Sequence, residues 1–377
     1  MKQGWEIKKL GEVCEVLNGY AFDSNLFTDD NTCVPIIRIR DIKRGYTETF
    51  YKGEYAQEYI INKGNYLIGM DGEFNIAEWS GKDSLLNQRV CKLSVVSSEL
   101  MKRFVLWYMS IALKQIEDET PFVTVKHLSS KKLLNIPIPV PPLPVQEQIV
   151  SELDLLSGII EKKREQLKEF DALAQSIFYD MFGDPITNEK GWEVKKLGEV
   201  CKTTSGGTPS KGQSNYYDGG TIPWLRSGEV NKMYIYDTEL FITEEGLENS
   251  SAKWFPEDTV VIAMYGATVG QVGILRNSMT TNQAICGVFP NETFIPIYLF
   301  HFLQSNKEEY IKMASGGAQP NISQNIIRET VIPIPPLPLQ HQFATKIEAI
   351  EKQKELIKQS ISETETLFNA RMQEHFG

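Results

Sequence analysis

The sequence contains few residues of the kinds that metal sites and disulfide frameworks require. Its 377 residues include five scattered cysteines with no CxxC pair, and four histidines, none of which has another His or Cys at metal-ligand spacing. An odd number of dispersed cysteines argues against a disulfide framework and against a zinc site. We therefore expect a cytoplasmic chain, in a reducing environment, without a bound structural metal.

A long apolar segment and a positive net charge are also absent. No run of about 18 apolar residues occurs, and the first residues lack the apolar core of a signal peptide, so we expect no membrane span. Lys and Arg number 39 against 49 Asp and Glu, and the net charge of −10 excludes a histone-like polycation. The 41% hydrophobic content still allows normal cores, and the length favours two or three domains.

The motifs of common catalytic sites are missing as well. A P-loop needs GxxxxGK followed by Ser or Thr, because backbone amides and Lys bind the phosphates, and no such string occurs. The glycine-rich run 266–273 lacks the spacing of a dinucleotide or methyl-donor site and is typical of a tight turn between strands. No GxSxG, HExxH or zinc-deaminase signature is present. The sequence therefore predicts a protein that recognises a ligand, or a scaffold, and not an enzyme.

An internal repeat organises the whole chain. The segment GWEIKKLGEVC at 4–14 returns as GWEVKKLGEVC at 191–201, with ten of eleven positions identical. A proline-rich block, Ile-Pro-Ile-Pro followed closely by Pro-Pro-Leu-Pro, ends just before Gln146 in the first copy and just before Gln340 in the second. We predict two copies of one plan, each a globular part, a proline hinge and a tail.

The tail of each copy has the apolar spacing of a long helix that starts beyond the prolines. Apolar residues alternate at intervals of four and three, as in a coiled-coil seam, and Glu and Lys fill the outer positions. The polar departures from the seam are Lys163 in the first tail and Lys354, Thr364, Arg371 and His375 in the second. The predicted seam consists of Ile149, Leu153, Leu156, Ile160, Leu167, Phe170, Ile177, Phe343, Ile347, Ile350, Ile357, Ile361 and Phe368.

Each helix needs a partner for its apolar stripe, and the other tail is the only equivalent one. The pair is either a rigid spacer between the globular parts, which their alternation in sequence favours, or one more helix pair that holds a single domain together. Antiparallel pairing would relate the two halves by a pseudo-two-fold axis.

The globular parts combine short β-type runs with helical patterns. Strands are predicted at 34–39, 59–61, 66–70, 90–95, 241–243, 259–265, 271–275 and 284–289, and helices at 100–115 and 296–313. The predicted fold class is α+β, with two α+β domains alternating with two long helices that pair as an antiparallel coiled coil in a pseudo-two-fold internal repeat. The predicted boundaries are 1–145, 146–183, 184–339 and 340–377.

Polar side chains suited to DNA bases recur in the two globular parts. Arg can bond guanine through two hydrogen bonds, Asn and Gln can bond adenine, and Lys binds phosphate. Asn87-Gln88 and Asn282-Gln283 open strands at matching positions, although such a pair can equally form a structural turn. The candidate DNA-binding residues are Arg38, Arg40, Lys43, Arg44, Asn87, Gln88, Arg89, Lys211, Arg226, Ser227, Asn282, Gln283, Gln319 and Asn321.

The combination of these features resembles the specificity (S) subunits of type I restriction-modification systems, HsdS. The strings that carry the resemblance are WEIKKLGE and its copy, the IPIP to PPLP blocks that lead to QEQ and QHQ, and IPWLRSGE at 222–229. The resemblance covers essentially the whole chain. It implies two target recognition domains, each of which reads one half of a bipartite DNA target, and helices that set the gap and dock methyltransferase subunits.

The resemblance also implies the partners and the chemistry. The partners would be double-stranded DNA, two methyltransferase (M) subunits and motor-nuclease (R) subunits, and the polar seam departures are interpreted as positions that face the methyltransferases. S-adenosylmethionine, ATP and Mg would serve the partner subunits, and no cofactor is expected in this chain. The alternative function is a non-catalytic coiled-coil adaptor or scaffold whose α+β heads bind proteins or glycans. Only the DNA-binding function predicts steeply salt-dependent DNA affinity.

The negative charge is unevenly distributed. Residues 1–145 carry 18 basic and 18 acidic side chains, whereas residues 184–339 carry 12 basic and 17 acidic ones. The acidic balance therefore does not exclude DNA. It predicts that the chain alone holds DNA weakly and that partner subunits provide much of the positive surface.

Overall fold

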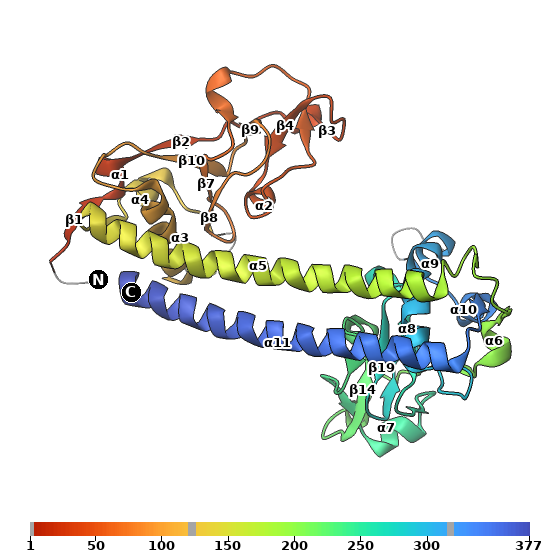
Figure 1. The fold of residues 1–377 in the computed structure, drawn as a ribbon. Helices are drawn as coiled ribbons and strands as arrows, with labels where there is room; N and C mark the ends of the chain where they lie inside the picture. Colours follow the sequence, from red (N-terminus) through yellow and green to blue (C-terminus); the bar gives the residue numbers. More distant parts are fainter. Residues whose placement is uncertain (1–3, 120–125, 315–319) are drawn as a thin grey trace. The chain divides into compact units, whose positions relative to one another are not determined.

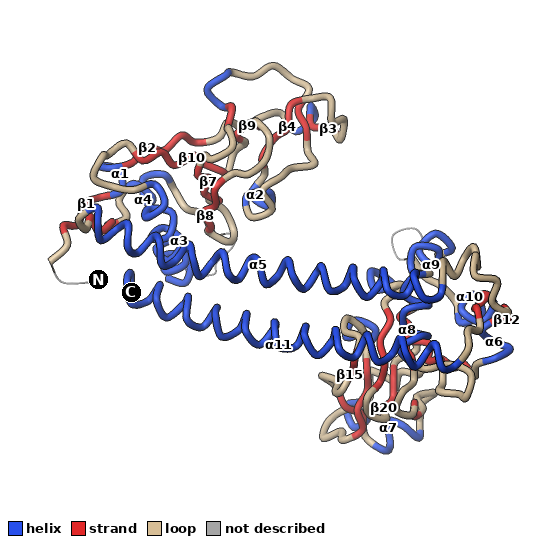
Figure 2. The backbone as a smooth tube through the Cα atoms, in the orientation of Figure 1, coloured by secondary structure: helices blue, strands red, loops and turns tan. Residues whose placement is uncertain are grey.

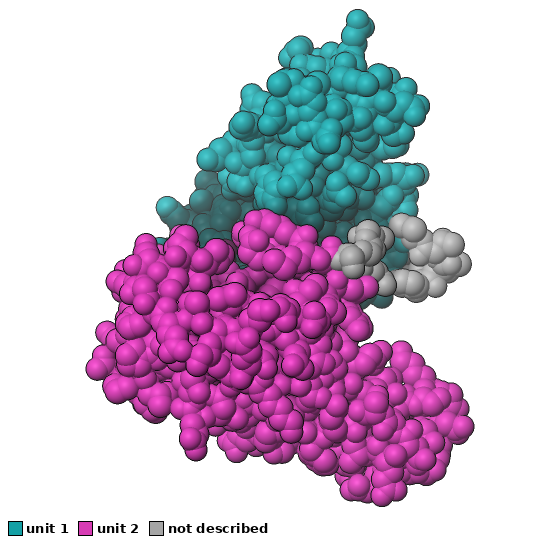
Figure 3. Space-filling view, turned by 90° about the vertical axis from the view of Figure 1, so that its right-hand side faces the viewer, with its two compact units in different colours: residues 1–164, 359–377 teal, residues 165–358 magenta. Residues whose placement is uncertain are grey.

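The computed structural model describes residues 4–119, 126–314 and 320–377, which pack into two units. Unit 1 comprises Met1–Arg164 and Gln359–Gly377, and unit 2 comprises Glu165–Lys358 (Figure 3). Each unit contains one globular part and a stretch of both long helices, α5 (Leu143–Phe182) and α11 (Leu337–Phe376) (Figure 1). The packing thus divides each helix between the two units, whereas the sequence pattern separated helices from globular parts.

Unit 1 is built on two sheets. One has the strand order β2-β10-β7-β8, and all its neighbours are antiparallel. The other has the order β3-β5-β4-β9-β6, in which β4 and β9 run parallel. The strands are β2 (Cys14–Asn18), β3 (Phe27–Thr28), β4 (Val34–Ile37), β5 (Phe50–Tyr51), β6 (Ile60–Ile61), β7 (Tyr66–Gly69), β8 (Asn75–Glu78), β9 (Ser84–Leu86) and β10 (Val90–Val95).

Unit 2 repeats this plan. Its antiparallel core has the order β13-β21-β18-β19, with β15 added in parallel to β19, and its second sheet has the order β16-β14-β20-β17 with β14 and β20 parallel. The strands are β13 (Thr203–Ser205), β14 (Ile222–Leu225), β15 (Tyr234–Ile235), β16 (Phe241–Ile242), β17 (Trp254–Phe255), β18 (Val260–Ala263), β19 (Val272–Leu275), β20 (Met279–Thr281) and β21 (Ile285–Val288). The predicted α+β class and internal repeat are confirmed (Figure 2).

Helices cover these sheets and complete each unit. In unit 1 they are η1 (Ser24–Leu26), α1 (Leu10–Val13), α2 (Ile39–Ile42), η2 (Gln57–Tyr59), α3 (Lys102–Glu119) and α4 (Ser130–Leu134). In unit 2 they are α6 (Leu197–Val200), η3 (Ser214–Tyr216), η4 (Ser227–Glu229), α7 (Glu244–Glu248), η5 (Gly266–Thr268), α8 (Pro296–Ser305), α9 (Lys307–Met313) and α10 (Gln324–Glu329).

The predicted helix 296–313 is two helices, α8 and α9. Asn306 interrupts it because its side-chain amide donates to the Phe302 carbonyl (2.9 Å) and so competes with the backbone.

The Ile-Pro-Ile-Pro part of each proline-rich block contributes to a strand and does not form a hinge. β11 (Pro137–Val140) pairs with β1 (Glu6–Lys9), and β22 (Val331–Pro333) pairs with β12 (Val194–Lys196), each as a two-stranded antiparallel sheet. Proline lacks an N–H donor but fits an edge strand. The two repeated sequence blocks therefore bind each other within each unit, which explains why they recur together.

The long helices begin earlier than the sequence pattern predicts. They start at Leu143 and Leu337, so that Pro144 and Pro338 lie inside the first turn. Proline is tolerated there because the first turn has no acceptor for its missing N–H. The predicted start beyond the prolines is wrong by three residues.

A buried glutamine anchors each long helix to its own unit. The Gln146 side chain, fully buried, donates to the Glu99 and Pro141 carbonyls (both 2.7 Å) and accepts from the Met101 N–H (2.9 Å). Gln340 makes the equivalent three bonds in unit 2. This accounts for the glutamine that follows both proline-rich blocks.

The two helices run antiparallel within each unit (Figure 1). In unit 1, Glu152 pairs with Arg371 (2.9 Å) and Lys163 binds Ser360 (2.6 Å). The later residue of α5 thus contacts the earlier residue of α11, as antiparallel helices require. In unit 2, Phe178 packs edge-on against Phe343 with ring centroids 5.6 Å apart. Every predicted seam residue is buried or half-buried.

The two lysines among the polar departures from the seam contact the other helix. The Lys163 ammonium donates to the Ser360 and Thr364 hydroxyls (2.6 and 3.1 Å). Lys354 binds Asp171 (2.7 Å) and Glu351 (2.6 Å). Burial opposes the charge of Lys354, but these carboxylates outweigh it and raise its pKa. The interpretation that these positions face methyltransferase subunits is therefore wrong for both lysines.

No helix among the described residues is long and apolar enough to cross a membrane.

Candidate nucleic-acid interface

A parallel strand pair positions the same polar residues in each unit. In unit 1, β4 and β9 pair in register Ile37↔Leu86, and Arg38 and Asn87 follow these two strands directly. The carboxyl ends of parallel strands meet at one edge of a sheet, so an arginine and an asparagine from distant parts of the sequence become neighbours. Unit 2 repeats the arrangement, because Arg226 follows β14 and Asn282 follows β20.

Each arginine is held by a short capping arrangement. The backbone N–H of Arg38 donates to the buried carboxylate of Asp41 (2.9 Å), three residues on. The N–H of Arg226 donates to Glu229 in the same way (3.2 Å). An acidic side chain at the third helical position satisfies a donor that the helix leaves free, and this fixes the backbone from which the guanidinium extends.

The repeated Asn-Gln pair forms a backbone turn. In unit 1 the Val90 N–H donates to the Asn87 carbonyl (3.3 Å), and in unit 2 the Ile285 N–H donates to the Asn282 carbonyl (3.2 Å). The side-chain oxygens do not close the turn: Oδ1 of Asn87 and of Asn282 are buried and accept no hydrogen bond from the described residues. A buried polar atom without a partner is costly, and its recurrence in both copies makes the two asparagines candidates for a ligand contact.

Five predicted DNA-binding residues of unit 1 line one cavity of about 580 Å³. They are joined by Phe22, by Ser24 of η1, by Phe27 of β3 and by Ile39 of α2. Cationic, amide and aromatic groups thus share one concave surface, the combination that base edges and stacked bases require. The lining residues are Phe22, Ser24, Phe27, Arg38, Ile39, Arg40, Asn87, Gln88 and Arg89.

Unit 2 presents a different electrostatic surface at the equivalent edge. Arg226 makes ion pairs with Glu229 (3.2 Å) and Glu239 (2.6 Å). Gln283 is engaged too, since its side-chain oxygen accepts a hydrogen bond from the Thr208 hydroxyl. The two units therefore combine one backbone plan with different side-chain chemistry.

The remaining predicted residues are not among those that line the unit 1 cavity. Lys43 forms an exposed ion pair with Glu73, and Arg44 and Lys211 are exposed. Ser227 opens η4 beside Arg226, and Asn321 is exposed and forms a backbone bridge with Tyr265. Gln319 lies outside the described residues.

Sequence reasoning did not single out Asp71 and His127, which lie beside the unit 1 cavity. Their backbones form an isolated antiparallel bridge, as Tyr265 and Asn321 do in unit 2. Asp71 binds Arg89, one of the cavity residues (2.7 Å). The only sequence signal was the collinear match of Met70-Asp71-Gly72 with Met264-Tyr265-Gly266.

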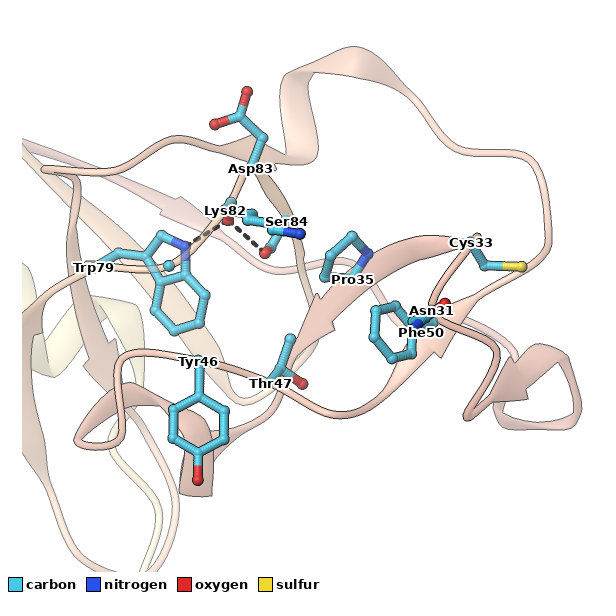
Figure 4. A pocket seen from close by; sticks show the side chains of 11 residues that line it. Asn31, Cys33, Pro35, Tyr46, Thr47, Phe50, Trp79, Lys82, Asp83 and Ser84 are labelled. Carbon is cyan, nitrogen blue, oxygen red and sulfur yellow. Dashed lines mark hydrogen bonds between the residues drawn. The ribbon is translucent and has the colours of Figure 1, made fainter.

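A larger cavity of about 660 Å³ in unit 1 contains none of the predicted DNA-binding residues. It lies at the start of β4 and β9, among Tyr46, Phe50 and the buried Trp79 (Figure 4). The Trp79 indole donates to the Lys82 carbonyl (2.8 Å), and the Ser84 hydroxyl donates to the same oxygen (2.7 Å). These bonds belong to the local fold, and the cavity has no counterpart of the repeated Arg-Asn pair.

Metal-ligand groups are also lacking. Within residues 4–119, 126–314 and 320–377, no cluster of three or more His, Cys, Asp or Glu side chains could hold a metal ion.

Comparisons with known proteins agree with the repeated architecture. The family model of the type I restriction modification DNA specificity domain matches residues 2–169 and again 189–366. The EcoBI type I restriction enzyme specificity subunit of Escherichia coli is 25% identical, over 92% of this chain and 79% of the relative. The MjaVIII specificity subunit of Methanocaldococcus jannaschii is also 25% identical, over 93% of this chain and 86% of the relative.

Solved structures share the fold. The S subunit of a type I restriction-modification system from M. genitalium aligns with a TM-score of 0.55 and 15% identity, over 99% of this chain and 96% of that one. A chain from a type I R-M system studied for its complex assembly aligns with a TM-score of 0.58 and 20% identity, over 100% of this chain and 98% of that one. Since the family model matches both halves of the repeat, the chain belongs to the family of type I restriction-modification DNA specificity proteins.

Proposed function

We propose that this chain is the specificity subunit of a type I restriction-modification complex and that each globular part reads one half of a bipartite DNA target. The observation that carries the proposal is the repeated constellation of an arginine and an asparagine at the edge of a parallel strand pair, where Asn87 and Asn282 each keep a buried, unpaired oxygen. Residues 1–145 and 184–339 would be the two target recognition domains.

The side chains suggest how the two half-sites are distinguished. In unit 1, Arg38 and Arg40 supply guanidinium donors to the cavity, and Asn87 and Gln88 supply amides that can pair with adenine. In unit 2, Nε and Nη2 of Arg226 each donate to a carboxylate, which leaves fewer donors for DNA than in Arg89, whose single carboxylate partner binds Nη1 only. Two recognition domains that share a fold but carry different side chains would read two different half-sites. The target would therefore be asymmetric.

The helix pair would serve as the spacer. Gln146 and Gln340 attach the two helices to their globular parts through three hydrogen bonds each, so that a recognition domain cannot slide along its helix. The length of the helix pair between the two anchored ends would set the number of unspecified base pairs between the half-sites. Each helical residue adds about 1.5 Å to this length.

The catalytic steps would belong to partners. Two methyltransferase subunits would dock on this chain and methylate adenine N6 with S-adenosylmethionine, and motor-nuclease subunits would use ATP and Mg. The chain itself would be non-catalytic and cytoplasmic and would hold no cofactor.

The test is co-expression of the full chain with the methyltransferase encoded beside it, followed by sequencing of N6-methyladenine in the host genome. We expect one bipartite, asymmetric motif. An assembled, active methyltransferase complex that modifies no such motif would overturn the proposal. So would binding of the complex to DNA with an affinity that does not fall as salt rises, which is expected for a protein or glycan adaptor.

Exchange of segments provides a sharper test. Replacing the middle of residues 1–145 by that of a relative should change one half-site and leave the other half-site and the gap unchanged. Inserting four residues, about one helical turn, into both long helices should lengthen the gap and leave both half-sites unchanged. A change in both half-sites in either experiment would contradict the proposal that each globular part reads one half-site and that the helices set the gap.

A further inference from the structure

A three-residue network at the rim of the unit 1 cavity is built to hold one arginine in place. Asp71 Oδ2 accepts from Nη1 of Arg89 at 2.7 Å, and Asp71 Oδ1 lies 2.5 Å from Nδ1 of His127. The carboxylate is mostly buried (15% exposed), whereas the side chains of Arg89 and His127 are 53% and 52% exposed. The anion thus lies beneath two exposed donor groups.

The backbone conformation of Arg89 is also unusual. Its φ of 72° lies in the left-handed region, which a non-glycine residue seldom adopts. The turn is held there because the Met70 N–H donates to the Arg89 carbonyl (2.9 Å) and the Gln88 N–H donates to the Tyr20 carbonyl (2.8 Å). Strained residues of this kind cluster at binding sites, where the surrounding structure maintains them.

Unit 2 lacks the network although it has the equivalent bridge and the equivalent Asn-Gln turn; its residue at the position of Arg89 does not have a positive φ. Tyr265 and Asn321 form the equivalent bridge, and the residue after Asn282-Gln283 is the buried Ala284. The fold therefore does not need an arginine, a carboxylate or a histidine at these places. The network is a property of unit 1 alone.

We propose that Arg89 reads a guanine in the half-site of unit 1 and that Asp71, supported by His127, is its positioning residue. The inference rests on the proposed function. A guanidinium is a planar fork that matches the two acceptors on the major-groove edge of guanine, and a carboxylate that fixes its orientation reduces the entropy lost on binding. A phosphate contact would need no such fixed orientation, because phosphate accepts from many directions.

The experiment uses the full chain in its complex with the methyltransferase, with the methylated motif and duplex binding as readouts. Arg89→Ala, Arg89→Lys and Asp71→Asn should each relax one guanine position of the unit 1 half-site and lower discrimination there roughly 5- to 150-fold. The rest of that half-site, the gap and the other half-site should persist. Lys114→Ala removes an exposed cation of the same unit, paired with Asp118 on α3, and should leave the motif unchanged.

Three outcomes would overturn the inference while leaving the proposed function intact. The first is a unit 1 half-site, identified by the segment exchange, that contains no guanine. The second is an unchanged motif with binding weakened equally on all duplexes, which is the result for a phosphate contact. The third is an Asp71→Asn complex whose motif is unchanged although Arg89→Ala relaxes it, which would remove the positioning role. Absence of any bipartite motif in the unaltered complex would overturn the proposed function itself.

Discussion

A buried histidine is expected to make unit 2 sensitive to acid. His301 lies on α8, where its ring packs against Phe178 of α5 and Phe343 of α11 with centroids 6.0 and 5.1 Å apart. Its Nε2 is buried without a hydrogen-bond partner among the described residues. Burial, reinforced by the positive charge of Lys354, lowers the pKa of His301 from 6.5 to about 3.

The direction of the pH effect follows from this lowered pKa. Between pH 6.5 and pH 3, the unfolded chain binds a proton at this histidine and the folded chain does not. The free energy of unfolding therefore falls as the pH falls through this range. At about 1.4 kcal/mol per pH unit, the loss from this one group between pH 6.5 and pH 5 is about 2 kcal/mol.

The assay is urea denaturation of the full chain at pH 7.5 and at pH 5, compared with His301→Phe, which preserves the aromatic packing and removes the titratable group. The variant should lose about 2 kcal/mol less than the wild type on acidification. His341→Gln is the matched control, because His341 is exposed on α11 and should leave the pH dependence unchanged. Equal losses in wild type and His301→Phe would refute the reasoning.

Three further predictions concern single side chains. Gln146→Leu should lower the free energy of unfolding by about 1–3 kcal/mol, since it removes the partner of the Met101 N–H and of two carbonyls, of which that of Pro141 is buried; an unchanged melting temperature would contradict this. Lys163→Met should change the free energy of unfolding by no more than about 1 kcal/mol in urea denaturation, because the apolar side chain replaces a half-buried cation whose partners are hydroxyl groups; a loss above 1 kcal/mol would contradict this. Cys33, the half-exposed thiol, should react first with a disulfide reagent in the native chain, whereas burial raises the pKa of Cys91 to about 12 and should block it; rapid labelling of more than one thiol would contradict this.

The long helices were predictable from the sequence because their signal is local. A four-three alternation of apolar residues specifies both the helix and its buried stripe, and every residue of the predicted seam, from Ile149 to Phe368, is buried or half-buried. The helix start was not predictable in the same way, because a proline favours both an extended strand and a first helical turn. Only the pairing of β11 with β1 decides where the strand ends and the helix begins.

The candidate interface depends on contacts that no local pattern encodes. Arg38 and Asn87 are far apart in sequence and meet only because β4 and β9 pair in parallel. The sequence identified both residue types as suited to bases, but it also named Lys43 and Arg44, which do not line the cavity with Arg38. The partners of the polar seam residues were missed for the same reason, since Lys163 becomes a half-buried cation only when the second helix places Ser360 and Thr364 beside it.

Charge and local structure together explain how an acidic chain could read DNA. The cavity of unit 1 gathers Arg38, Arg40 and Arg89, whereas the equivalent edge of unit 2 holds Arg226 between Glu229 and Glu239. Release of counterions from phosphate supplies affinity that is independent of sequence, and a net charge of −10 limits this term for the isolated chain. Contacts with base edges depend instead on fixed donors and acceptors at short range, and these remain effective whatever the net charge of the chain. A chain with oriented arginines and amides on an acidic background would therefore separate specificity from affinity: under the proposed function it would choose the sequence, and basic surfaces on partner subunits would hold the duplex.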